Sequence, residues 1–174
     1  MKAVVVYRSK SGFARQYAEW IAEELGADLV EGSKTTVETL APYDTIIYGG
    51  GLYATGINGI KLITSHMDRL QGKRIVVFAT GAAPGRPEEL EGVTNTNFSP
   101  EQQKLVHFFY LRGGFDYNKL TPIDRILMIL LRLKMAWRHK RGVKLHPDEK
   151  GMLNAYRHAV NFCRRENISG LIAY

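Results

Sequence analysis

The sequence contains a single cysteine, Cys163, and this scarcity excludes two kinds of framework that stabilise small proteins. One cysteine cannot form a disulfide within the chain, and it cannot complete a zinc site that needs several cysteines. With 174 residues the chain needs neither, because a chain of this length buries roughly 70% of the surface that its unfolded form exposes. We therefore expect one domain over residues 1–174, in a reducing compartment such as the cytoplasm.

Long apolar runs are also missing. No stretch reaches the roughly 20 apolar residues of a membrane-spanning helix. The first residues, 1–7, run directly into a turn and lack the pattern of a secretory signal peptide. The sequence thus predicts a chain that does not span a membrane and leaves open its attachment to a membrane surface.

An acidic excess is absent as well, since 24 Lys and Arg residues stand against 17 Asp and Glu residues and give a formal charge of +7. Seven of the basic residues lie between positions 125 and 147, a window without any Asp or Glu. These seven are Arg125, Arg132, Lys134, Arg138, Lys140, Arg141 and Lys144. The positive charge therefore belongs to one segment, which indicates a local attachment surface.

Short apolar runs alternate with helical patterns along most of the chain. Strands are expected at residues 3–7, 27–30, 44–49, 74–79 and 105–111, and helices at 17–25, 60–70, near Glu101 and at 148–164. Parallel neighbours need a crossover, which a helix fills. The pattern therefore predicts an α/β fold, a doubly wound five-stranded parallel sheet of order 2-1-3-4-5. Ligands of such sheets bind beyond the carboxyl ends of the strands, here the first and third.

A polar loop at residues 7–14, Tyr-Arg-Ser-Lys-Ser-Gly-Phe-Ala, follows the first strand. A phosphate in this loop would meet backbone N–H groups at a helix N-terminus and the hydroxyls of Ser9 and Ser11. The loop has one glycine and so matches neither a Walker A loop nor G-x-G-x-x-G. A plain polar turn in which Ser11 caps the helix is the alternative.

The loop resembles that of the flavodoxin family, Ser/Thr-x-Ser/Thr-Gly-Asn-Thr, which wraps the phosphate of FMN. Ser9, Ser11 and Gly12 match, whereas Phe13 stands where Asn is usual and Ala14 where the last Thr is usual. The resemblance covers the strand pattern from residue 2 to residue 111 and the final helix. It implies FMN as cofactor, with its phosphate held by Ser9, Lys10, Ser11, Gly12, Phe13 and Ala14.

The resemblance also implies that two further loops hold the flavin ring. The loop at residues 49–56, Gly-Gly-Gly-Leu-Tyr-Ala-Thr-Gly, offers Tyr53 for stacking, and its glycines allow close approach of the backbone. The loop at residues 80–84 would line the other side of the ring. The expected ring contacts are Gly50, Gly51, Leu52, Tyr53, Ala54, Thr55, Thr80, Gly81, Ala82 and Ala83. A flexible loop with a surface tyrosine is the alternative for residues 49–56.

An insert at residues 112–147 separates the fifth strand from the last helix and is far longer than the usual connection of roughly 2 to 6 residues. Its helix, 122–138, places Ile126, Leu130 and Trp137 on one face and Arg132 opposite. Such a helix suits an anionic membrane surface. Packing on the domain or pairing with a second copy in a homodimer are the alternatives. Nucleic-acid binding is disfavoured, because the basic residues flank Leu and Ile rather than stacking aromatics.

The layout of domain and insert resembles the flavodoxin-type, menaquinone-dependent protoporphyrinogen dehydrogenases. That resemblance implies an oxidoreductase with a quinone acceptor at the inner face of the membrane, and it assigns no catalytic residue. An FMN electron carrier, a flavin reductase and a non-catalytic interaction module that has lost FMN remain as alternatives. The five histidines show no ligand spacing, so no metal site is expected.

Overall fold

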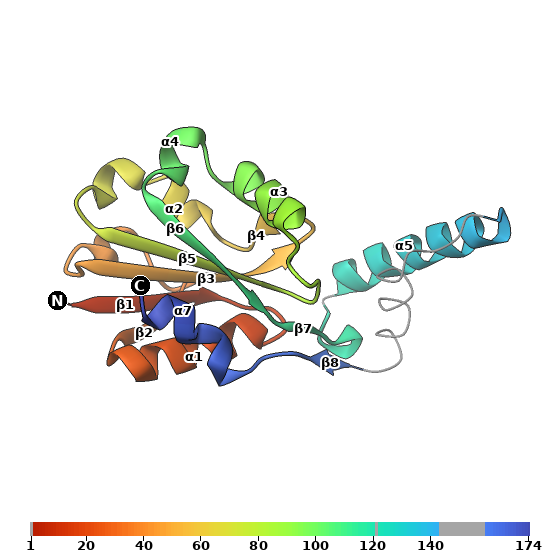
Figure 1. Ribbon diagram of the computed structural model, residues 1–174, viewed down its shortest axis with the longest axis horizontal. Helices are drawn as coiled ribbons and strands as arrows, with labels where there is room; N and C mark the ends of the chain where they lie inside the picture. The colour runs from red at the N-terminus through yellow and green to blue at the C-terminus, as the bar shows by residue number, and fades with distance from the viewer. Residues whose placement is uncertain (1, 121, 143–158) are drawn as a thin grey trace.

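The computed structural model describes residues 2–120, 122–142 and 159–174, and its centre is a parallel sheet (Figure 1). The strands are β1 Ala3–Arg8, β2 Asp28–Glu31, β3 Thr45–Tyr53, β5 Arg74–Gly81 and β6 Val106–Arg112, in the order β2-β1-β3-β5-β6. A short strand, β4 Gly56–Ile57, pairs antiparallel with β3. Apart from β4, the order is the predicted 2-1-3-4-5 winding.

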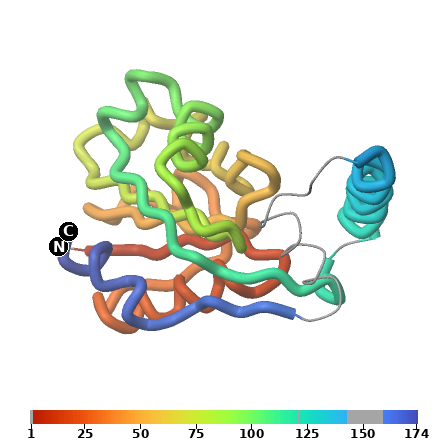
Figure 2. The backbone as a smooth tube through the Cα atoms, turned by 45° about the vertical axis from the view of Figure 1, so that its right-hand side comes forward, coloured from red at the N-terminus to blue at the C-terminus, as the bar shows by residue number. Residues whose placement is uncertain are grey.

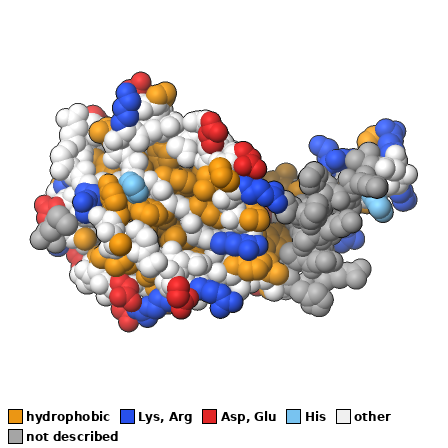
Figure 3. All heavy atoms as spheres, viewed as in Figure 1, with side chains coloured by type: hydrophobic (Ala, Val, Ile, Leu, Met, Phe, Trp, Pro, Cys, Tyr) orange, Lys and Arg blue, Asp and Glu red, His pale blue; other side chains and the backbone are white. Residues whose placement is uncertain are grey.

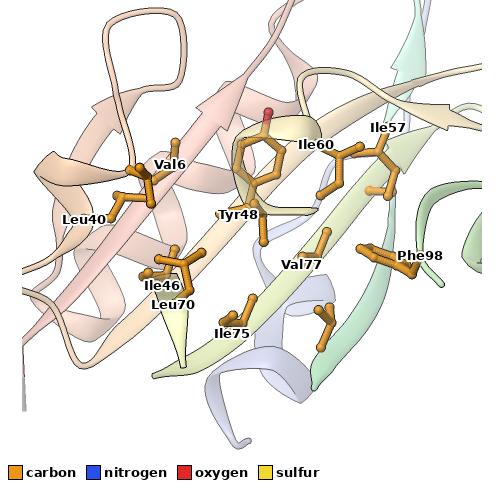
Figure 4. Packing of buried hydrophobic residues seen from close by; sticks show 14 of the residues in the cluster. Val6, Leu40, Ile46, Tyr48, Ile57, Ile60, Leu70, Ile75, Val77 and Phe98 are labelled. Atoms are coloured by element: carbon orange, nitrogen blue, oxygen red, sulfur yellow. The ribbon is translucent and has the colours of Figure 1, made fainter. Parts of the chain in front are cut away.

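Alternate residues of the central strands supply two separate cores. In β1, Val4 and Val6 face one layer and Val5 faces the other, and all three have an exposed fraction of 0%. The first core joins β1, β3 and β5 to side chains such as Leu40, Leu70 and Phe98 (Figure 4). The second core packs the opposite face of the sheet against the first helix and the C-terminal segment. Burial on both faces explains the unbroken apolar runs.

The helical layer that covers the second core consists of α1 Phe13–Leu25 with the C-terminal elements η4 Arg165–Ile168 and α7 Ser169–Ile172. Gly26 ends α1 in the left-handed conformation at φ 58°, as its position after the amphipathic pattern predicts. On the opposite face of the sheet, over the first core, lie η1 Glu38–Leu40, α2 Lys61–Thr64, η2 Met67–Leu70, α3 Pro87–Asn97 and α4 Pro100–Gln103. The single helix expected at residues 60–70 is thus two short ones, and α3 was not predicted.

The glycine triplet lies inside a strand rather than in a loop. β3 continues through it to Tyr53 and turns back into β4, with Leu52 opposite Ile57. A Cβ on Gly50 would come 2.6 Å from Cγ2 of Ile57, so this glycine allows β4 to fold over β3. The expectation of a loop was wrong because glycine is a weak strand former whose tertiary role is invisible in sequence.

The insert leaves the sheet at its carboxyl edge. β7 Gly114–Phe115 is followed by η3 Tyr117–Lys119 and by α5 Pro122–Lys140, which confirms the helix expected there. β7 pairs with β8 Val160–Asn161, and α5 lies beyond the strand ends, to the side of the sheet (Figures 1 and 2). None of the described helices has the length and apolar character needed to cross a bilayer.

The helix expected at residues 148–164 is wrong at its C-terminal end. Val160 and Asn161 form β8, and Cys163 lies in irregular chain before η4, packed beside the second core. Positions 148–158 of that expected helix lie outside the described residues. Hydrogen bonding of Phe162 N–H to the carbonyl of Gly113, at 2.8 Å, continues the extended chain beyond β8. Tertiary pairing with β7 therefore overrides the helical pattern here.

Candidate functional site

A cavity of about 460 Å³ lies where β1, β3 and β5 end. Its size falls within the roughly 300–1,000 Å³ of typical small-molecule sites. Five segments of chain contribute to it: the loop after β1, the β3–β4 hairpin, the end of β5, the β7 region and α5. The lining residues are Ser11, Phe13, Gly51, Leu52, Tyr53, Ala54, Thr80, Gly81, Ala82, Gly114, Phe115, Asp116, Leu120, Asp124, Leu127, Met128 and Leu131.

The structure brings together residues from all three segments that the sequence nominated. Nine of the nominated residues line the cavity: Ser11, Phe13, Gly51, Leu52, Tyr53, Ala54, Thr80, Gly81 and Ala82. The other seven lie beside these along the chain and are not among the lining residues: Ser9, Lys10, Gly12, Ala14, Gly50, Thr55 and Ala83. The convergence follows from the winding of the sheet, because parallel strands end at one edge.

The loop after β1 is shaped by its own first serine. Ser9 Oγ accepts a hydrogen bond from the N–H of Gly12 at 3.0 Å, and Gly12 adopts φ 95° as the N-cap of α1. Ser11 is therefore not the cap, contrary to the plain-turn alternative. Because Gly12 has no side chain, the cap leaves backbone N–H groups of the first turn to another acceptor. The positive end of the α1 dipole lies at the same point.

Phe13, which stands where the flavodoxin loop has Asn, is buried beside Gly114 at the start of the insert and lines the cavity. Its side chain is 8% exposed, and a Cβ on Gly114 would come 2.7 Å from its ring. The same Cβ would lie 2.2 Å from the carbonyl oxygen of Val160 in β8. Ala14, in the first turn of α1, is 1% exposed. Phe13 therefore packs the β7–β8 pair against α1, which gives a structural reason for the departure from the family loop.

The β3–β4 hairpin presents Tyr53 at its tip. Ala54 turns the chain with φ 53°, a conformation that non-glycine residues rarely adopt. Asn97, the last residue of α3, accepts a hydrogen bond from Ile57 N–H at 2.8 Å and donates one to the carbonyl of Thr55 at 2.7 Å. Burial, together with the negative charge of Asp124, raises the pKa of Tyr53 to about 12. Asn97 of α3 thus holds the tip of the hairpin in place. The phenol of Tyr53 keeps its proton and is neutral at neutral pH.

The end of β5 is held by its neighbour β6 and the chain that follows. The N–H of Gly113 donates to the carbonyl of Gly81 at 2.8 Å, and Tyr110 Oη donates to the carbonyl of Ala83 at 2.7 Å. Arg112 Nε donates to the carbonyl of Ala82 at 3.2 Å. These contacts fix a wall of small residues. A flat ligand can approach the backbone closely along such a wall.

The wall contributed by α5 was not predicted. Asp124, Leu127, Met128 and Leu131 face the cavity at spacing i, i+3, i+4 and i+7, the periodicity of one helical face. From the sequence alone, Leu127 and Leu131 only broaden the apolar face that carries Ile126 and Leu130. A second apolar stripe, distinct from the one through Ile126, was the signal that could have revealed them.

Lys10 connects three of these segments. Its Nζ lies 3.2 Å from Oδ2 of Asp124 in α5 and 4.1 Å from the centroid of the Tyr53 ring. The side chain of Asp124 is 17% exposed, and that of Lys10 is 40% exposed. A cation over an aromatic face is attracted to it. The loop after β1, the hairpin tip and the first turn of α5 are therefore linked by one ammonium group.

The opposite face of α5 is an apolar ridge, which we define as Ile123, Ile126, Ile129, Leu130, Leu133 and Trp137. The exposed fractions of these side chains run from 46% to 71%. Basic side chains surround the far end of the helix (Figure 3), where the Arg141 guanidinium lies 3.5 Å from the Trp137 ring centroid. Clustered exposed apolar side chains are typical of interaction sites.

Within the described part of the chain, no group of three or more His, Cys, Asp or Glu side chains is placed to hold a metal ion.

Comparison with known proteins identifies the family. The family model described as flavodoxin domain matches residues 4–141, a range that includes α5. The comparison with curated proteins finds no match.

Solved structures with a similar fold include the oxidised flavodoxin 1 from Bacillus cereus, which is 20% identical with a TM-score of 0.49 over 64% of this chain and 84% of that one. A flavodoxin, WrbA-like protein from Agrobacterium tumefaciens is 23% identical, with a TM-score of 0.48 over 61% and 74%. The Trp repressor binding protein from Bacillus subtilis is 15% identical, with a TM-score of 0.49 over 64% and 85%.

Proposed function

The chain belongs to the flavodoxin domain family, and we propose that it is an oxidoreductase that binds FMN in the cavity between the strand ends and α5. One observation carries the proposal: the three nominated segments, far apart in the sequence, converge on one cavity of suitable size. Family membership supports the nature of the ligand.

The chemistry of the cavity fits FMN. The N-terminus of α1, with Gly12 as its cap and Ser11 at the cavity wall, offers N–H and O–H donors for a phosphate. Gly51, Gly81 and Ala82 leave room for a flat ring beside the backbone, and Tyr53 offers an aromatic face. Bound FMN would supply two-electron redox chemistry at its ring. The protein's part is to orient the ring and, through Leu127, Met128 and Leu131, to exclude water from one side of the cavity.

A large hydrophobic reductant such as protoporphyrinogen, with a quinone as electron acceptor, is the substrate pair that we propose. The support is the apolar wall of α5, which gives the cavity a face suited to an apolar substrate. A flavin reductase or an FMN electron carrier would need no such wall. The resemblance in layout to the protoporphyrinogen dehydrogenases agrees with this choice.

We further propose that the apolar ridge of α5 docks on an anionic membrane at its inner face. The ridge is exposed, basic residues accompany it, and Asp124 is the one acidic residue in α5. Apolar burial and attraction to anionic lipid then act together. A quinone dissolved in that membrane would be within reach of a peripheral protein.

An absorbance spectrum tests the cofactor. The purified protein is mixed with FMN, excess FMN is removed, and the spectrum is recorded beside that of untreated protein. Retained absorption bands of oxidised flavin are expected. A protein that retains no FMN would refute the oxidoreductase and leave the interaction module, with α5 as its functional surface.

The substrate is tested with the loaded protein under anaerobic conditions. Protoporphyrinogen should bleach the flavin bands, and a soluble menaquinone analogue should restore them. Bleaching by NADH or NADPH, without reaction with protoporphyrinogen, would favour the flavin reductase instead.

A further inference from the structure

Lys10 occupies a position where two anions compete for it. In this structure its ammonium group pairs with Asp124 at 3.2 Å, while its backbone belongs to the loop proposed to hold the flavin phosphate. The ammonium also lies over the ring of Tyr53, 4.1 Å from its centroid. A lysine ammonium is a compact charge on a flexible stem, so it can change partners without a change in the backbone.

Asp124 brings a negative charge into the same cavity. Its carboxylate lines the cavity and is largely shielded from water, with 17% of the side chain exposed. Its charge is felt at the neighbouring phenol, because it contributes to the raised pKa of Tyr53. A phosphate dianion arriving near Ser11 would be repelled by this carboxylate and attracted by Lys10.

We propose that Lys10 is exchanged between Asp124 and the flavin phosphate. Asp124 then lowers the affinity for FMN relative to riboflavin, and FMN binding loosens the first turn of α5. This proposal rests on the proposed FMN site. Coupling between two binding events is reciprocal. If Asp124 weakens phosphate binding by holding Lys10, then phosphate weakens the attachment of α5 by the same factor.

The exchange has a structural consequence for the proposed substrate site. The first turn of α5 precedes Leu127, Met128 and Leu131, which form the apolar wall of the cavity. Loss of the Lys10–Asp124 pair would remove the contact that joins this end of the wall to the loop after β1, while Arg125 Nη2 still donates to the carbonyl of Asn118 at 2.6 Å. Cofactor loading and access to the apolar part of the cavity would then be linked.

The test compares FMN with riboflavin, which lacks the phosphate, by isothermal titration. Asp124→Asn should raise FMN affinity roughly two- to fivefold, the range expected for a partly exposed ion pair, and leave riboflavin affinity unchanged. Lys10→Met should lower FMN affinity by a larger factor than it changes riboflavin affinity, because Lys10 also lies over the Tyr53 ring. Asp116→Asn is the matched control, because it removes the same charge from the same cavity and leaves the Lys10–Asp124 pair intact.

A double variant separates the exchange from general electrostatics. In the Lys10→Met background, Asp124→Asn should raise FMN affinity no more than Asp116→Asn does. Hydrogen exchange supplies an independent readout: FMN, but not riboflavin, should speed exchange of the backbone amides at residues 126–128.

Three results would overturn the proposal although FMN binds. These are an unchanged or lowered FMN affinity in Asp124→Asn, an equal gain in Asp116→Asn, and amide exchange at α5 that FMN does not alter. Failure of every variant and of the wild type to bind either flavin would instead refute the FMN site itself.

Discussion

Gly49 lies directly beside the ring of Phe78 on the neighbouring strand, and a Cβ built on Gly49 would come 1.9 Å from Cζ of that ring. Phe78 has an exposed fraction of 0%, so its ring is enclosed by other protein atoms and cannot turn out into solvent. Gly49→Ala should therefore reduce the free energy of unfolding by roughly 1–3 kcal/mol or more, as overpacking does elsewhere. Urea denaturation measures the change.

The matched control is Gly92→Ala. Gly92 lies within α3, and a Cβ there meets no atom within 4 Å. Because alanine favours a helix more than glycine does, the free energy of unfolding of this variant should stay the same or rise by up to about 1 kcal/mol. Equal loss in both variants would show that Gly49 is not a packing requirement.

Ser11 should contribute to phosphate binding through its hydroxyl. Ser11→Ala should lower FMN affinity roughly tenfold, the cost of one hydrogen bond to a charged group, and leave riboflavin affinity unchanged. Fluorescence titration with both flavins measures this. Ser65→Ala, at the exposed end of α2, is the control and should change neither affinity. A parallel loss of both flavins in Ser11→Ala would place the hydroxyl at the ring rather than at the phosphate.

Leu130 should be required for binding to anionic lipid vesicles. Leu130→Arg removes one apolar side chain from the ridge, so vesicle binding in a flotation assay should fall roughly tenfold or more. Leu105→Arg makes the same change at a side chain of similar exposure, 59% against 57%, just before β6 and away from α5.

Leu105→Arg should bind vesicles as the wild type does. Wild-type protein that ignores anionic vesicles, and forms a dimer in light scattering that Leu130→Arg abolishes, would show that the ridge pairs two copies instead.

Alkaline pH should destabilise the protein through its buried phenols. Burial raises the pKa of Tyr53 and Tyr110 to about 12, whereas tyrosine in an unfolded chain has a pKa of about 10. Above pH 10 the unfolded state loses these protons first, so the free energy of unfolding should fall as the pH rises toward 12. Urea denaturation between about pH 9 and pH 11 measures the slope. Tyr53→Phe should flatten it, and an unchanged slope would contradict the role of this phenol.

The sheet was predictable because its strands are buried on both faces. Runs such as residues 3–7 and 74–79 carry little but apolar residues, and Gly26 marks a helix end by local geometry alone. The three cavity segments at residues 7–14, 49–56 and 80–84 could also be predicted, because the winding of a parallel sheet brings the strand ends to one edge. The continuation of β3 beyond Gly49, the end of the expected strand at residues 44–49, could not be predicted, because the contact that requires glycine at Gly50 comes from Ile57 on another strand.

The α5 wall and the role of Phe13 were missed for a related reason. Whether a helical face such as Leu127 and Leu131 meets a cavity or water depends on where the insert docks. That docking is set by the β7–β8 pair and by Phe13, which meet only in the folded chain. The departure of Phe13 from the family motif is therefore explained by its contact with Gly114, about 100 residues away along the chain.

The β7–β8 pair places Gly114 opposite Asn161, so the intervening chain leaves and returns at one point of the sheet edge. A segment whose two ends adjoin can be lengthened, shortened or exchanged with little effect on the body that carries it. The insert between β7 and β8 can thus diverge in evolution, and with it the substrate, while the sheet is kept. For protein engineering, the β7–β8 pair is a point at which a different insert could be grafted onto an unchanged flavodoxin-type sheet.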